Sequence, residues 1–135
     1  MKKIKLIVVF LFTILLVQFN IVNAADKWTA QDIALETTWQ VLHIVDWGTT
    51  LNIADNPKQY REYNPILGTH PSRGTVNIYM ASGAILHPII SHLLPREVKL
   101  WNWKIPARTL FQSITIGTTG ACVANNLAIG LKIDF

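Results

Sequence analysis

The sequence predicts an all-α fold, a small membrane helical bundle of three helices that follow an N-terminal signal peptide. Three long stretches, at residues 29–54, 76–94 and 107–131, are predominantly apolar. Half of the 135 residues are hydrophobic and only 15% are charged. A disordered chain has the opposite composition, with few apolar residues and many charges. Because the apolar stretches are much longer than ordinary strands, we expect helices and almost no strand.

Residues 1–24 match the pattern of a secretory signal peptide. Lysines precede a long apolar run, and Val22 and Ala24 fit the positions before a cleavage site. The alternative is an uncleaved signal-anchor, because residues 4–22 are as long as the stretch of about 20 residues that crosses a bilayer. Residues 25–135 then form a single helical membrane domain, and the chain has four spans if the signal stays. An exported chain of this kind is expected in a bacterial inner membrane.

The net charge of +4 comes mostly from the signal and does not indicate a nucleic-acid partner. When Lys2, Lys3 and Lys5 are left out, nine of the 12 basic residues remain, against eight acidic residues. We expect the lipid bilayer to be the main partner, with other membrane proteins or a second copy of the chain as further candidates. The single cysteine, Cys122, excludes an internal disulfide and a multi-cysteine zinc site.

The first long stretch is expected to be a helix with one polar face. Asp26 or Thr29 can cap its start, and Asp32 lies in the first turn, where the helix dipole favours an anion. Five polar residues recur at spacings of three and four, which places them along one face. Ionisable side chains are costly at membrane depth, so this polar arc should face the bundle interior. The arc consists of Glu36, Gln40, His43, Asp46 and Thr50.

The polar arc has a functional and a structural interpretation. As a functional site it would bind an ion, a proton or a small ligand. As a structural feature it would form a hydrogen-bond network between helices, completed by Gln112, Thr119 and Asn126 of the third stretch. A further interpretation leaves the first helix half exposed outside the membrane.

Residues 55–75 form a loop that contains three prolines and two glycines. Ser72, or Thr75 in its place, is the expected cap of the next helix. The loop carries a short motif that either builds a turn or binds a partner. If the motif builds a turn, Glu62 would accept a hydrogen bond from Arg73 or cap the following helix. The motif consists of Glu62, Asn64 and Pro65.

The second stretch, residues 76–94, has no charged side chain and should form a helix that Pro88 kinks and Pro95 closes. The following residues, 95–107, place tryptophans beside lysines. This composition is typical of segments at the level of lipid headgroups.

The third stretch, residues 107–131, combines a narrow polar line with a stripe of small residues at spacings of three and four. In a membrane such a stripe lets a second helix approach closely. Asn126 lies on the polar line, whereas Asn125 needs a separate partner or a pore. The expected helix-packing residues are Gly117, Gly120, Ala121 and Ala124.

Neither a metal site nor a catalytic site is expected. His43, Asp46, His87 and His92 suggest imidazole and carboxylate ligands, but the spacing of five between the last two does not place them on one helix face. The motifs of serine hydrolases, zinc proteases, nucleotide-binding loops and thiol oxidoreductases are missing from the sequence. We therefore predict no metal, no cofactor and no catalytic residue.

Several short motifs follow one another in a distinctive order. Asp46-Trp47-Gly48-Thr49-Thr50 precedes Glu62-Tyr63-Asn64-Pro65, and Asn125-Asn126 comes near the end. This order resembles small bacterial and phage-associated integral-membrane proteins with a D-x-x-x-T helix followed by an E-x-N-P loop. The resemblance extends over most of residues 30–135. It implies a membrane location and no catalytic activity.

The sequence therefore favours a non-enzymatic membrane protein of structural or interaction type. The alternative is a small transporter or channel-like element that uses the polar arc. A membrane-embedded hydrolase or metalloenzyme is disfavoured because the sequence lacks the corresponding motifs.

Overall fold

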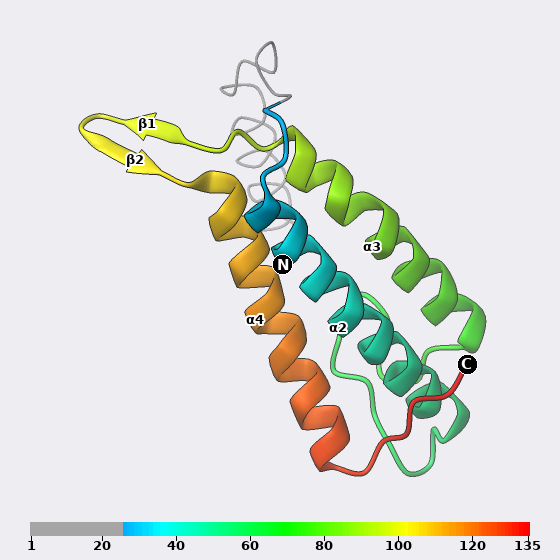
Figure 1. Ribbon diagram of the computed structural model, residues 1–135. Coiled ribbons are helices and arrows are strands. Elements are labelled where there is room, and N and C mark those ends of the chain that lie inside the picture. The colour runs from blue at the N-terminus through cyan, green and yellow to red at the C-terminus, as the bar shows by residue number, and fades with distance from the viewer. Residues whose placement is uncertain (1–25) are drawn as a thin grey trace, which may run out of the picture.

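The computed structural model describes residues 26–135, which form three long helices and one β-hairpin. The helices are α2 (Ala30–Asp55), α3 (Arg73–Leu93) and α4 (Ala107–Ala128), and the hairpin consists of β1 (Val98–Leu100) and β2 (Trp103–Ile105). Figure 1 shows α2 lying between α3 and α4, and α2 makes most of the contacts between helices. The predicted helical bundle is confirmed. The predicted signal peptide lies outside the described residues.

Two of the three helices begin at the capping residues that the sequence indicates. The Thr29 hydroxyl accepts from the backbone N–H of Asp32, and the Asp32 carboxylate accepts from the Thr29 N–H at 2.8 Å. The Ser72 hydroxyl accepts from the N–H of Thr75 at the start of α3. These bonds satisfy N–H groups that a helix leaves unpaired in its first turn. Pro88 lies inside α3 and does not end it.

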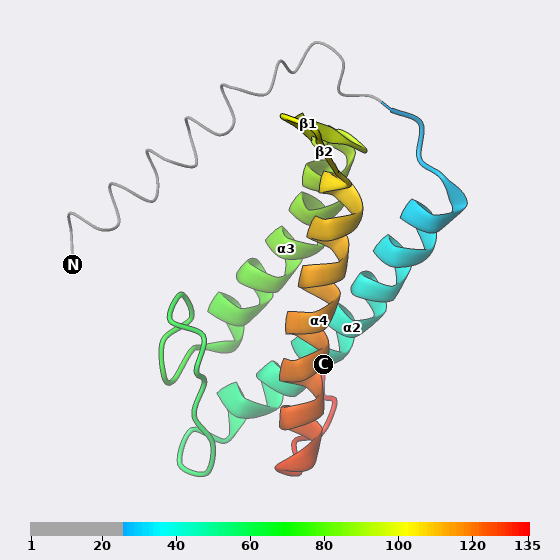
Figure 2. The same cartoon turned by 90° about the vertical axis from the view of Figure 1, so that its left-hand side faces the viewer.

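The hairpin corrects the expectation that the chain has almost no strand. Val98 pairs with Ile105 and Leu100 with Trp103 in antiparallel register. The turn between them contains Trp101, whose φ of 53° lies in the left-handed region. Each strand has only three residues, so no alternating pattern is long enough to indicate it in the sequence. Figure 2 shows the hairpin beyond one end of the bundle and the loop between α2 and α3 at the other.

A small apolar core lies toward the loop end of the bundle. Leu51 of α2 packs there with Val76 and Met80 of α3. The C-terminal segment also returns to this end, where the N–H of Asp134 donates to the carbonyl of Gly48 at 3.2 Å. A side chain at position 48 would collide with this segment, because a Cβ there would lie 2.5 Å from Cγ2 of Ile133.

The small residues of α4 do not form the predicted helix–helix contact within the chain. Gly117, Ala121 and Ala124 are exposed, and a Cβ on Gly117 would meet nothing within 4 Å. Gly120 comes closest to another helix, with Leu42 Cδ1 3.7 Å from the position of its Cβ. The reason is the rotation of α4 about its axis, which turns the polar line of this helix inward and the small residues outward.

Among residues 26–135, no helix is both long and apolar enough to cross a membrane. The prediction of membrane spans at residues 29–54, 76–94 and 107–131 is therefore not confirmed, although helices lie at all three places.

Candidate functional site: a polar interior and an end cavity

The polar arc of α2 faces the interior of the bundle. Four of its five residues hydrogen-bond to α3 or α4, and the fifth, Thr50, is only 2% exposed. The predicted third-helix partners are also engaged, since Gln112, Thr119 and Asn126 all bond to side chains of α2. The contacts of the arc join Glu36 to His87, Ser91 and Gln112, Gln40 to the Ala84 carbonyl, His43 to the Met80 carbonyl, and Asp46 to Asn126.

The Glu36 carboxylate is the centre of this network. Nδ1 of His87 lies 2.9 Å from Oε1 and 3.0 Å from Oε2 of Glu36. The Ser91 hydroxyl donates to Oε2 at 3.0 Å and the Gln112 amide at 3.3 Å. A buried carboxylate is tolerated when donors surround it. One carboxylate of α2 is thus shared by side chains of both other helices.

Stacked aromatic rings fill the middle of the bundle. The ring of Trp39 lies 3.6 Å from that of His87 with an interplanar angle of 6°, and 4.5 Å from that of His43. Phe111 of α4 also stacks on His87, at 4.8 Å. The Trp39 indole N–H donates to the Thr119 hydroxyl at 3.1 Å. These rings leave the His87 imidazole enclosed by apolar surface.

Arg108 joins the three helices near the hairpin. Its side chain is fully buried, and Nε donates to the carbonyl of Ser91 at 2.8 Å and to that of Leu94 at 3.1 Å. Nη1 lies 3.5 Å from the carboxylate of Asp32 in the first turn of α2. Carbonyls at a helix C-terminus lack partners within the helix, and a guanidinium satisfies several at once. Arg108 therefore caps α3 while it pairs with α2.

The polar interior has a geometry that resembles a catalytic triad. The Thr115 hydroxyl lies 2.8 Å from Nε2 of His87, whose Nδ1 contacts Glu36, so that a hydroxyl, an imidazole and a carboxylate are in line. The hydroxyl is also 3.0 Å from the Phe111 carbonyl. The rings of Trp39 and Phe111 stack on the imidazole, and none of the three residues of this arrangement belongs to the lining of the cavity at the loop end of the bundle.

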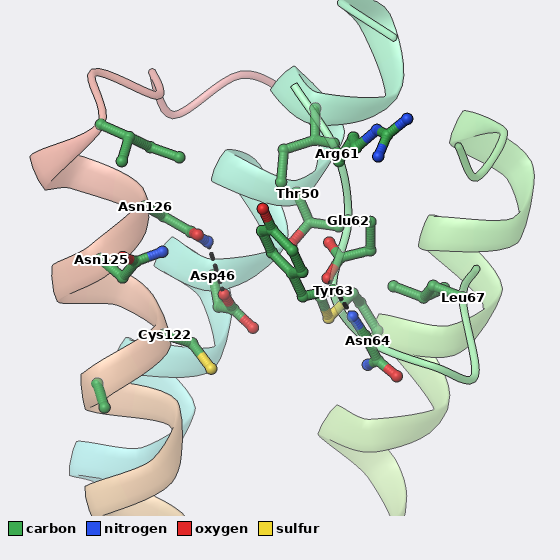
Figure 3. A pocket seen from close by; sticks show the side chains of 14 residues that line it. Asp46, Thr50, Arg61, Glu62, Tyr63, Asn64, Leu67, Cys122, Asn125 and Asn126 are labelled. Carbon is green, nitrogen blue, oxygen red and sulfur yellow. Dashed lines mark hydrogen bonds between the residues drawn. The ribbon is translucent and has the colours of Figure 1, made fainter. Parts of the chain in front are cut away.

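A cavity of about 500 Å³ lies at the loop end of the bundle (Figure 3). It is bounded by α2, α4, one residue of α3 and the loop between α2 and α3. Asp46 and Glu62 both line it, and Arg61 and Tyr63 at its rim are exposed. The other polar residues of the lining are Thr50, Asn64, Asn125 and Asn126. Asn125, which does not lie on the polar line of α4, is thus placed at a cavity.

The loop motif holds Glu62 beside this cavity. The N–H of Asn64 donates to Oε1 of Glu62 at 2.8 Å, and Oδ1 of Asn64 accepts from the N–H of Ile66 at 3.0 Å. Glu62 and Asn64 line the cavity, whereas Pro65 is exposed and does not. The expected pairing of Glu62 with Arg73 is wrong, because Arg73 pairs with Asp55.

Sequence reasoning missed the residues that complete the network. The sequence patterns indicate His87 only as a candidate metal ligand and Asp32 only as an anion near the start of the helix dipole, and they give Arg108 no role in the interior. A signal was present, since His87 and Ser91 are four residues apart and Arg108 is four residues before Gln112 on the polar line of α4. A spacing of four places both members of each pair on one face of their helix.

The side chains considered as metal ligands are dispersed. Within residues 26–135, no group of three or more His, Cys, Asp or Glu lies close enough together to hold a metal ion. His92 is at the surface, where it accepts from the Trp28 indole at 2.9 Å. Cys122 is a free thiol in the lining of the cavity.

Comparison with known protein families, curated proteins and solved structures finds no match for this chain. The resemblance to small integral-membrane proteins with the D-x-x-x-T and E-x-N-P motifs therefore stays a prediction.

Proposed function

We propose that this chain is a non-enzymatic membrane protein of interaction type, whose helical bundle lies with its outer surface against lipid. The observation that carries the proposal is an inverted distribution of side chains. A network of charged and polar groups occupies the interior of the bundle beside the small apolar core, while many large apolar side chains lie on the outside. Ionisable residues at membrane depth face the inside of a bundle and pair there.

Between their end residues, the three helices have no exposed charge. Residues 33–54, 74–94 and 109–131 contain only two charged side chains, Glu36 and Asp46, and neither is exposed. Contiguous exposed apolar surface of this kind is rare on a monomer in water and marks a lipid or protein contact. The apolar residues at the surface include Val41 and Ile44 of α2, Ile78, Ile85, Leu86, Ile89 and Leu93 of α3, and Leu110, Ile114 and Leu127 of α4.

Some of the polar residues that interrupt each helix face inward. In α3 the buried ones are His87 and Ser91, and in α4 they are Arg108 and Gln112, whereas Asn77, Ser82, Ser113 and Asn125 are exposed. The buried polar groups therefore lower the mean hydropathy of each helix without adding to the surface that it presents outward. The 21 residues of α3 extend about 32 Å at 1.5 Å per residue, and the hydrocarbon core of a bilayer is about 30 Å thick.

The two ends of the bundle have the composition of membrane–water boundaries. The hairpin exposes Trp101 and Trp103, at 93% and 73%, next to Lys99 and Lys104. Tryptophan and lysine gather at the level of lipid headgroups. The opposite end carries the charged side chains of the loop and the C-terminal segment, namely Asp55, Lys58, Arg61, Glu62, Arg73, Lys132 and Asp134.

An interaction role fits this surface better than transport or catalysis. The exposed small residues of α4, including Gly117 and Ala121, offer a face that a helix of another membrane protein or of a second copy can approach closely. A channel along the polar arc would have to pass the stacked rings of Trp39, His43 and His87, which pack in the middle of the bundle.

Single-cysteine labelling tests the membrane proposal. In a Cys122→Ser background, Ile85→Cys places a thiol on the outer face of α3, and Tyr63→Cys places one in the loop. Both side chains are exposed in the isolated chain, at 62% and 84%. In membrane vesicles open to the reagent on both sides, a charged maleimide should label the loop thiol and should label the Ile85 position only after detergent is added. Alkaline carbonate should leave the protein in the membrane pellet.

Equal labelling of both thiols without detergent, or release of the protein by carbonate, would show that the outer face of α3 contacts water.

A further inference from the structure

We propose that the cavity at the loop end binds a small organic cation with a primary ammonium head. The two carboxylates of Asp46 and Glu62 and the hydroxyl of Thr50 would accept its three N–H donors. This binding does not depend on the membrane proposal, because it rests only on the lining of the cavity.

The two carboxylates have accepting capacity that the protein does not use. Oδ1 of Asp46 accepts from the Asn126 amide at 3.2 Å, and Oε1 of Glu62 accepts from the Asn64 N–H at 2.8 Å. Within residues 26–135, the second oxygen of each has no hydrogen-bond partner, and neither carboxylate forms a salt bridge. Two negative groups in one cavity favour a positively charged ligand.

Thr50 gives an independent indication of a ligand. Its side chain is 2% exposed and lines the same cavity. In the part of the chain that the structure describes, its hydroxyl makes no hydrogen bond. Thr50 is not among the buried side-chain atoms without a partner, so its hydroxyl opens to the cavity, where a donor on a bound ligand can reach it.

Arg61 does not neutralise the cavity. It belongs to the rim and is exposed, and Figure 3 shows its guanidinium directed away from the carboxylates of Asp46 and Glu62. In this view the Cys122 thiol and the Tyr63 ring lie beside the carboxylates and amides of the lining, and none of these groups is a cation.

The size and the remaining lining indicate an organic cation rather than a metal ion. A space of about 500 Å³ is in the range of small-molecule sites, which are about 300–1,000 Å³. Ile53, Leu67 and Ile129 supply apolar walls for an alkyl or aryl body, and the Tyr63 ring at the rim can contact a cation with its face. Primary ammonium is favoured because it offers three donors and no acceptor, which matches a lining with free acceptors.

Titration calorimetry of the purified full-length protein in detergent tests the proposal, with 2-phenylethylamine as the probe and 2-phenylethanol as its neutral counterpart. We expect saturable binding of the amine and at least about tenfold weaker binding of the alcohol, the effect of one charge-assisted hydrogen bond. Asp46→Asn and Glu62→Gln should each weaken amine binding by about tenfold. Asp55→Asn is the matched control, since Asp55 is an acid at the same end that pairs with Arg73 outside the cavity.

Helical circular dichroism spectra equal to that of the unaltered protein establish that the variants are folded. If one cavity variant does not fold, the other provides the test. Equal affinities for amine and alcohol, unchanged amine binding in the folded cavity variants, or binding of Ca²⁺ or Mg²⁺ without binding of the amine would each overturn the proposal.

Discussion

At the scale of single residues, Glu36 shows how a charged side chain can hold helices together. Glu36 lies in α2 and is only 6% exposed. Its carboxylate accepts hydrogen bonds from His87 and Ser91 of α3 and from Gln112 of α4. Removing one partner of a buried polar network leaves the others without acceptors, and this costs more than the network contributes to stability when intact.

Glu36→Leu should therefore lower the free energy of unfolding by about 3 kcal/mol, because the buried donors of His87, Ser91 and Gln112 would lose their acceptor. Thr37→Leu is the matched control, since Thr37 is the next residue of the same helix and is exposed. Denaturant titration in detergent, followed by circular dichroism, gives both values.

The double variant Glu36→Leu/His87→Phe should recover part of the lost free energy of unfolding, because it removes one of the buried donors that lack an acceptor. Strictly additive losses in the double variant would contradict a direct interaction of Glu36 with His87.

At the scale of helices, the glycines show which faces are in contact. A Cβ on Gly83 of α3 would lie 3.0 Å from Cε1 of His43, which is held by the Met80 carbonyl and by stacking on Trp39. A Cβ on Gly117 of α4 would meet nothing within 4 Å. The sequence indicated close packing at Gly117 and did not single out Gly83, although the structure places the tight contact at Gly83.

Gly117→Ala should raise the free energy of unfolding by up to about 1 kcal/mol, the usual gain in helix propensity. Gly83→Ala should gain nothing or lose stability, because the added methyl group has to displace the His43 ring. Thermal unfolding of the two variants side by side makes the comparison, and equal gains would mean that α3 does not approach His43 closely.

At the scale of the whole molecule, the apolar outer face of the helices predicts where the protein tolerates an added surface charge. Ile85 on the outer face of α3 and Ile66 in the loop are exposed to similar extents, at 62% and 74%. If lipid covers α3, Ile85→Asp places a charge in hydrocarbon at a cost of about 3 kcal/mol, whereas Ile66→Asp places one in water. The carbonate-resistant fraction should fall for Ile85→Asp only. Equal retention of both variants would argue against lipid on this face.

The candidate site was partly predictable from the sequence. The polar arc of α2 could be derived because a helical period converts spacing into a shared face. The cavity could not be derived, since Asp46 and Glu62 lie on different elements and meet only through the fold of the loop. The motif around Glu62 and Asn64 was visible in the sequence, but its proximity to Asp46 was not.

The sequence by itself determined the three helices and the polar face of α2, and it narrowed each of two helix caps to a pair of candidates that includes Thr29 and Ser72, because these features depend on residues within a few positions of one another. Only the tertiary structure decided which side of α4 turns inward, and hence that Gly117 is exposed while Arg108 is buried. It also decided the pairing of Glu36 with His87 across 51 positions of the chain. The physical reason is that a polar group in the interior needs a partner, and several donors in this chain could have supplied one. The packing of the helices selects among them.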